Sequence, residues 1–139
     1  MKRIVTIAIC LLAIFGLMSS ASAQDHTVQA TVPFGFHIGN RWLPAGIYTM
    51  STAWWSPDVI LIRSGDYKLA LYSLAHPDGQ HSTSDKMVFK KYGDQYFLHE
   101  VLCPTGRMNV EFPSSRRERE ARIREARRAG ASEVTLALR

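Results

Sequence analysis

Residues 86–103 read KMVFKKYGDQYFLHEVLC, and this stretch decides the fold class. Two runs rich in apolar and aromatic residues, 86–92 and 95–103, flank the dipeptide Gly93-Asp94. Such a dipeptide between two strand-like runs is typical of a hairpin with a tight two-residue turn. The stretch therefore predicts two long antiparallel strands.

The same alternation of strand-like runs and turn residues extends toward the N-terminus. Gly39-Asn40 predicts a second tight turn, and the run at 59–62 is apolar on both faces, which predicts a central strand covered on its two sides. Residues 54–58 are expected to form a loop, and 75–85 the longest loop. The other expected strands lie at 27–32, 34–38, 41–43, 47–52, 67–74 and 107–112.

The C-terminal part has a different character. Ser115 followed by Glu118 is the spacing of a capping box, and strong helix formers follow. We expect one helix at about 115–129, lying shallowly on the domain, and a final strand at about 133–138.

These elements together predict a mainly β fold. We expect a small antiparallel β-barrel or β-sandwich of about seven to nine strands, with one C-terminal α-helix followed by a short strand. The chain has 139 residues, 46% hydrophobic and 21% charged, with a formal net charge of +5. Such values exclude a disordered tail, a collagenous repeat, a disulfide scaffold and a large two-domain enzyme.

Residues 1–23 resemble a cleaved signal peptide. Lys2 and Arg3 precede an apolar run over 4–18, and small residues follow, with Ala21 and Ala23 at the positions that a signal peptidase reads. The apolar run is shorter than a spanning helix requires. We expect cleavage after Ala23, a single β-rich domain over 24–139, and a secreted or periplasmic location.

Cys103 is the only cysteine outside this leader. A single thiol cannot close an internal disulfide, so the hydrophobic core must hold the fold. Cys103 ends an apolar run, which favours burial over a bridge to another chain.

The sequence resembles a family of short, uncharacterised, secreted β-rich proteins of environmental bacteria. The resemblance rests on the segments Val32-Pro-Phe-Gly-Phe36, Leu43-Pro-Ala-Gly-Ile-Tyr48, Leu61-Ile-Arg-Ser64, 88–98 (VFKKYGDQYFL) and 114–120 (SSRRERE). It implies secretion and a β-rich fold over most of the chain, and it implies no activity, cofactor or catalytic residue.

Exposed aromatic side chains are the first candidate for a binding site. Trp54 and Trp55 are adjacent, and Trp42 and Tyr48 are candidates to lie beside them. These four residues predict a stacking platform for a sugar or a peptide. In the alternative, both tryptophans plug an open end of the barrel.

The predicted helix is the second candidate. Residues 113–130 carry seven Arg against three Glu, and the candidate contact residues are Arg116, Arg117, Arg124, Arg127 and Arg128. They can bind an anionic lipid surface or polysaccharide, bind a partner protein of the envelope, or form a solvated helix with internal ion pairs. Export argues against nucleic acid.

Histidines are the third candidate. The loop with His76, Asp78, His81 and Asp85 carries metal-ligating residue types, although their spacing matches no established metal motif. His99 and Glu100 are adjacent, so strand alternation is expected to point them to opposite faces. We find no nucleophile, zinc or phosphate-loop motif, and we expect no catalytic residue, metal or cofactor.

Three functions remain open at this point. The first is a non-enzymatic binding or assembly module of the cell envelope or extracellular space. The second is a carrier that holds a small apolar ligand in the barrel interior. The third is a metal-dependent hydrolase that uses the loop at 76–85.

Overall fold

The computed structural model describes residues 27–79, 82–128 and 132–138. The predicted leader, His81 and Ala129 lie outside these residues. The strands are β1 (Thr27–Val32), β2 (Phe36–Ile38), β3 (Arg41–Leu43), β4 (Gly46–Ala53), β5 (Ser56–Ser64), β6 (Ala70–Leu74), β7 (His76–Pro77), β8 (Lys86–Tyr92), β9 (Gln95–Cys103), β10 (Met108–Glu111) and β11 (Ser132–Ala137). The helix is α2 (Arg116–Ala126).

The first sheet is antiparallel, with the strand order β1-β4-β5-β6. Its strands alternate as the sequence predicted: Val28, Ala30 and Val32 of β1 are buried, and the residues between them are exposed. Gly39 at the β2–β3 turn and Gly93 at the β8–β9 turn both have a positive φ, as their hairpins require.

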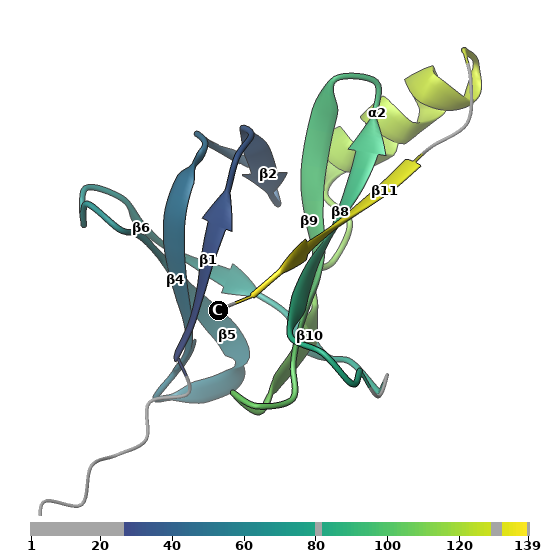
Figure 1. Ribbon diagram of the computed structural model, residues 1–139. Helices are drawn as coiled ribbons and strands as arrows, with labels where there is room; N and C mark the ends of the chain where they lie inside the picture. Colours follow the sequence, from purple (N-terminus) through teal and green to yellow (C-terminus); the bar gives the residue numbers. More distant parts are fainter. Residues whose placement is uncertain (1–26, 80–81, 129–131, 139) are drawn as a thin grey trace, which may run out of the picture.

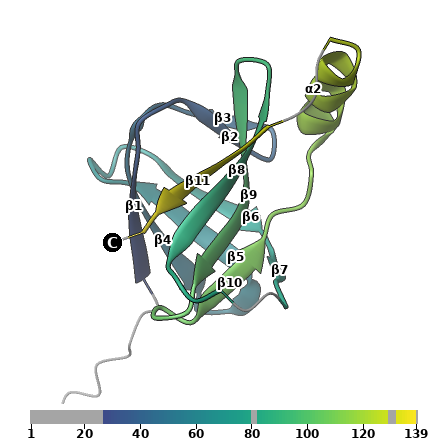
Figure 2. The same ribbon diagram turned by 45° about the vertical axis from the view of Figure 1, so that its right-hand side comes forward.

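The second sheet has the order β11-β8-β9-β10-β7, and β2 joins it by pairing with β9. The β8–β9 hairpin at its centre is the one predicted from residues 86–103. The β2–β9 pairing is parallel, so the sheet is mixed rather than purely antiparallel. Figure 1 shows the two sheets facing each other, and Figure 2 shows the same arrangement after a rotation of 45°.

The main core lies between the two sheets. Its largest fully buried side chains include Tyr48, Phe36, Phe89, Met50 and Met87, which come from both sheets. Edge-to-face contacts of Phe36 with the rings of Tyr48 and Phe89 tie the sheets together. The mainly β prediction is confirmed, and the two curled sheets form a half-barrel.

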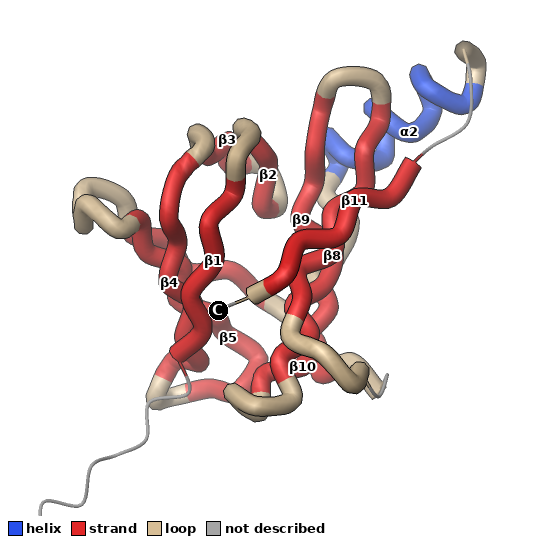
Figure 3. The backbone as a smooth tube through the Cα atoms, viewed as in Figure 1, coloured by secondary structure: helices blue, strands red, loops and turns tan. Residues whose placement is uncertain are grey.

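The C-terminal helix packs on the outside of the β8–β9 hairpin (Figure 3). Ala121 contacts Tyr92 and Phe97 there, while most other helix residues stay exposed. The helix is shorter than the predicted range 115–129, and the strand after it, β11, pairs with β8 at the sheet edge. Among the described residues, no helix has the length and hydropathy needed to cross a membrane.

Four local expectations are wrong. The strand expected at 67–74 begins only at Ala70, because Tyr67 takes a positive φ in the turn after β5. Residues 54–58 form no loop, because Trp54-Trp55 is a two-residue turn and β5 starts at Ser56. The segment 75–85 contains the short strand β7, which pairs with β10. The described chain also covers β5 on one side only: Ile60 and Ile62 are buried in the core, whereas Leu61 lies on the outer face and is only partly buried.

Candidate functional site

The β4–β5 turn presents two tryptophans to solvent. Trp54 is 91% exposed and Trp55 is 52% exposed. A register shift between Thr52 and Ala53 precedes the turn, and such a bulge twists a hairpin end and redirects its side chains. The two indoles meet edge to face, with ring centroids 5.5 Å apart. This turn therefore holds both indoles outside the core.

Tyr72 extends this aromatic group onto the sheet face. It lies on β6, is 58% exposed, and its ring centroid is 5.1 Å from that of Trp55. The strand register explains the approach, because Ser51, Leu61 and Tyr72 lie side by side across β4, β5 and β6. Their side chains consequently share the outer face of the sheet.

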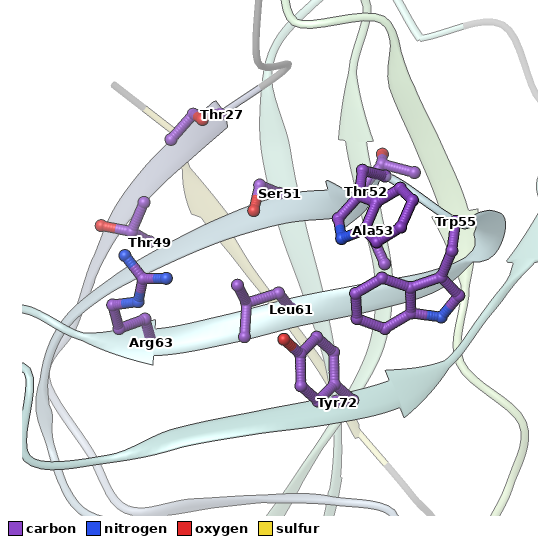
Figure 4. Close-up of a pocket in the computed structure, with 10 residues that line it drawn as sticks. Thr27, Thr49, Ser51, Thr52, Ala53, Trp55, Leu61, Arg63 and Tyr72 are labelled. Atoms are coloured by element: carbon purple, nitrogen blue, oxygen red, sulfur yellow. The ribbon is translucent and has the colours of Figure 1, made fainter.

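A pocket of about 270 Å³ lies on this face. We call it the aromatic pocket, and Figure 4 shows how its residues are arranged. The indole of Trp55 and the ring of Tyr72 stand at one end, Ser51 and Leu61 lie between, and Arg63 and Thr49 are at the other end. The full lining is Thr27, Thr49, Ser51, Thr52, Ala53, Trp54, Trp55, Leu61, Arg63 and Tyr72.

The side chains that line the aromatic pocket are suited to binding a ligand rather than to catalysis. Aromatic faces and Leu61 offer apolar surface, and the hydroxyls of one serine, three threonines and Tyr72 can donate or accept hydrogen bonds. Arg63 supplies one positive charge, and its guanidinium carbon lies 5.8 Å from the ring centroid of Tyr67. The lining includes no carboxylate, histidine or cysteine, the groups that most often act as general acids, bases or thiol nucleophiles.

Two of the four predicted platform residues lie elsewhere. Tyr48 is a core residue, 2% exposed, whose hydroxyl donates a 2.6 Å hydrogen bond to the carbonyl of Pro44. Burial raises the pKa of the Tyr48 hydroxyl. Trp42 is 59% exposed on β3, where its indole covers Gly35. The expectation that Trp42 and Tyr48 join Trp54 and Trp55 is therefore wrong, because β3 does not border the pocket and β4 turns Tyr48 inward.

The helix arginines are spread around the helix. Arg116, Arg117 and Arg124 line an open hollow of about 450 Å³ with Asn40 and Glu120. Arg116 pairs with Glu120 at 2.9 Å, as expected for residues four apart. The other two predicted contact residues, Arg127 and Arg128, follow the helix end and are exposed. The structure thus brings three of the five arginines into one hollow, and one of them is paired.

The histidine loop does not converge on one point in the part of the chain that is described. His76 lies on β7 opposite Glu111, whereas Asp85 accepts hydrogen bonds from the backbone and the hydroxyl of Thr105. These hydrogen bonds lower the pKa of Asp85. Over residues 27–79, 82–128 and 132–138, no group of three metal-ligating side chains is close enough to hold an ion.

His99 and Glu100 contact each other, contrary to strand alternation. The His99 Nε2 is 3.2 Å from a Glu100 carboxylate oxygen and 3.6 Å from one of Glu111. The cause is a register shift in which Val88 pairs with Glu100 and Phe89 with Leu98, leaving His99 unpaired. Such a bulge brings two successive side chains to one side, so the expectation of opposite faces is wrong.

Cys103 is buried and free. Its sulfur accepts a hydrogen bond from the backbone N–H of Gly106 at 3.3 Å and lies 3.6 Å from the hydroxyl of Thr105. The thiol therefore has a packing role in the core, as its apolar surroundings in the sequence indicated.

Of the ten residues that line the aromatic pocket, the sequence predicted only Trp54 and Trp55. Among the eight that were missed, Leu61, Arg63 and Tyr72 matter most for binding. All three occupy outward positions of β5 and β6, and only the register between these strands brings them beside the tryptophans. The run at 59–62 could have indicated this face. A strand with one solvated face normally alternates apolar and polar residues, whereas this run is apolar at every position. Comparisons of the chain with family models, with curated proteins and with solved structures found no match, so the site is described from its own geometry.

Proposed function

We propose that the protein is an exported, non-enzymatic binding module that holds a saccharide in the aromatic pocket. One observation carries this proposal: an apolar face of a central strand is left uncovered and is bordered by exposed aromatic rings. Leu61 lies on that face beside Trp55 and Tyr72. Exposed apolar groups of this kind mark contact sites, because burying them against a ligand is favourable.

The mixture of groups in the pocket supports a sugar. A sugar ring has C–H bonds on its faces and hydroxyls around its edge. The rings of Trp55 and Tyr72 offer surface to the C–H bonds, while Thr27, Thr49 and Ser51 offer hydrogen-bond partners to the hydroxyls.

A peptide ligand has less support at this place. Extended peptides bind well where a sheet edge leaves backbone N–H and C=O groups unpaired. The pocket lies mainly over β4 and β5, which are both paired on their two sides, and it reaches the edge strands β1 and β6 at Thr27 and Tyr72. A peptide lying over β4 and β5 would have to bind through side chains alone.

The two other functions also have less support. Fully buried side chains such as Phe36, Tyr48 and Phe89 fill the space between the sheets that an apolar cargo would need. The hydrolase hypothesis required His76, His81 and a carboxylate at one point. His81 lies outside the described residues, and Asp85 is engaged by Thr105.

Export is supported by the residues that precede the domain. The basic start at Lys2 and Arg3, the apolar run and Ala21 and Ala23 are the features of a cleaved leader. Expression of the full chain in a bacterial host, followed by mass spectrometry of periplasm and medium, tests this part. A mature chain that begins at Gln24 is expected, and a full-length chain in the cytoplasm would contradict it.

Binding is tested by tryptophan fluorescence and calorimetry with neutral and acidic oligosaccharides. The ligands are oligomers of glucose, xylose, mannose, galacturonate and mannuronate. We expect at least one to bind, and we expect Trp55→Ala and Tyr72→Ala each to lower the affinity about tenfold or more, since each removes one stacking surface.

The matched control is Trp42→Ala, which removes a tryptophan of similar exposure on β3. This variant is expected to bind like the parent protein, and thermal unfolding of all three variants checks that they are folded. The proposal fails if no oligosaccharide binds, or if Trp42→Ala weakens binding as much as Trp55→Ala.

A further inference from the structure

The cationic end of the aromatic pocket indicates a more specific ligand. Building on the proposed function, we infer that the bound saccharide is acidic: its ring stacks on Trp55 and Tyr72, and its carboxylate binds the guanidinium of Arg63. The natural ligand is then a polysaccharide that contains uronic acid. The contacts and spacing of Arg63 carry this inference.

Arg63 lies within reach of a ring stacked on the aromatic end. Leu61 and Arg63 are two residues apart on β5 and therefore share the outer face, with their Cα atoms about 7 Å apart. Tyr72 is the register partner of Leu61 on the neighbouring strand, and strands lie about 4.8 Å apart. Figure 4 shows Arg63 and Tyr72 bordering the same pocket, with Leu61 between them. The carboxylate of one sugar unit can consequently reach Arg63 while its ring contacts the aromatic side chains.

Arg63 is also positioned and free to accept an anion. Its guanidinium lies over the Tyr67 ring, and this cation–π contact restricts the side chain without using its N–H donors. Asp66, the acidic residue of the turn that follows β5, is already engaged: it accepts hydrogen bonds from Ser64 and the backbone of Lys68, and it pairs with the Lys68 ammonium at 3.6 Å. Within the described residues, Arg63 makes no ion pair.

A guanidinium matches a carboxylate better than it matches a neutral hydroxyl. It can donate two parallel N–H bonds to the two carboxylate oxygens, and such charge-assisted bonds are about twice as strong as neutral ones. Without Lys2 and Arg3 of the leader, residues 24–139 carry 15 basic and 12 acidic side chains, a formal net charge of +3, which also favours the approach of an acidic polymer. Both effects predict that binding weakens as salt is added.

The decisive comparison uses one sugar with and without its charge. Oligogalacturonate and oligomannuronate are each compared with their carboxyl methyl esters by calorimetry with the processed protein. We expect an acidic oligomer to bind at least about tenfold more tightly than its ester, and its affinity to fall with increasing sodium chloride. Arg63→Gln is expected to remove this preference, so that the acidic oligomer binds no more tightly than its ester.

Arg41→Gln serves as the matched control, because Arg41 is an exposed arginine on β3 outside the aromatic pocket. It is expected to keep the full preference for the acidic oligomer. The inference is overturned if ester and acid bind equally, if only neutral oligosaccharides bind, or if Arg63→Gln and Arg41→Gln behave alike. These outcomes differ from a failure of the proposed function, in which neither acidic nor neutral oligosaccharides bind the parent protein.

Discussion

At the scale of single residues, Gly65 and Gly106 occupy positions with little room for a side chain, and neither has a left-handed backbone conformation. In the turns after β5 and β9, the positive φ belongs to Tyr67 and Arg107 and not to Gly65 or Gly106. A Cβ on Gly106 would lie 2.9 Å from the Cys103 sulfur and 3.1 Å from a Val28 methyl group. The sequence predicted turns at both places, but it could not show which residue would take the left-handed conformation.

Gly106→Ala is therefore expected to destabilise the protein. The added methyl group overpacks a buried site, which costs about 1–3 kcal/mol in the free energy of unfolding. In the background Cys103→Ala the sulfur is gone, so the same substitution should cost less. Urea denaturation of the parent, the two single variants and the double variant measures this coupling. Strictly additive effects would show that the contact with Cys103 is not the cause.

His37 is a buried residue whose pKa affects stability. Its ring stacks on Phe97 with centroids 4.9 Å apart, and among the described residues its Nδ1 has no hydrogen-bond partner. Burial, and next the charge of Arg117, lower its pKa below the ordinary 6.5, while a backbone hydrogen bond with Tyr96 opposes this shift. Below pH 6.5 the unfolded chain binds the proton more readily than the folded one, so His37 lowers stability as pH falls.

His37→Phe should remove this contribution. We expect the free energy of unfolding of the parent to decrease between about pH 7.5 and pH 5, and we expect the decrease to be smaller in the variant. Denaturation curves at several pH values in this range give the comparison. An identical pH dependence in both proteins would refute the role of His37, and Arg117→Gln should give an intermediate result because it removes only the second cause.

At the scale of elements, hairpins were predictable and irregularities were not. Gly93 with its flanking apolar runs was sufficient to predict the β8–β9 hairpin, because turn chemistry and alternation act locally. The bulge at His99 depends on pairing with β8, and the residue pattern of β9 alone did not indicate it. The contact of His99 with Glu100 and Glu111 was missed for the same reason.

The helix shows a cap that the sequence predicted correctly. The Ser115 hydroxyl accepts a hydrogen bond from the Glu118 N–H at 3.1 Å. Because Glu118 and Ala121 are the only buried residues of α2, this cap should contribute strongly to local helix stability. Ser115→Ala is expected to lower the opening free energy of the helix by about 1 kcal/mol.

Amide hydrogen exchange measures this effect directly. Helix amides should exchange roughly fivefold faster in Ser115→Ala, while amides of β8 and β9 should change little. Ser114→Ala is the control, because Ser114 accepts a hydrogen bond from Arg119 through its backbone carbonyl, whereas the N-cap hydroxyl is that of Ser115. Equal exchange rates in the two variants would show that the cap does not stabilise α2.

At the scale of the whole molecule, the sequence predicted that Trp54 and Trp55 belong to a binding site, but it did not predict which residues lie beside them. The two tryptophans stood out because adjacent indoles cannot both enter a core. Tyr72 and Arg63 became part of the site only through the order β4-β5-β6, which places three strands side by side in fixed register. Tyr48, by contrast, was placed wrongly because the face it occupies on β4 depends on that register.

We propose that a saccharide binds at Trp54, Trp55 and Tyr72 on the outer face of the first sheet. The most direct measurement follows the indole N–H signals of the ¹⁵N-labelled processed protein by NMR during addition of the neutral and acidic oligosaccharides. The chain has three tryptophans, and Trp42, which lies outside the pocket, is an internal control. We expect the signals of Trp54 and Trp55 to shift in a saturable way while the Trp42 signal stays in place. A shift of the Trp42 signal alone, or no shift with any of the oligosaccharides, would contradict it.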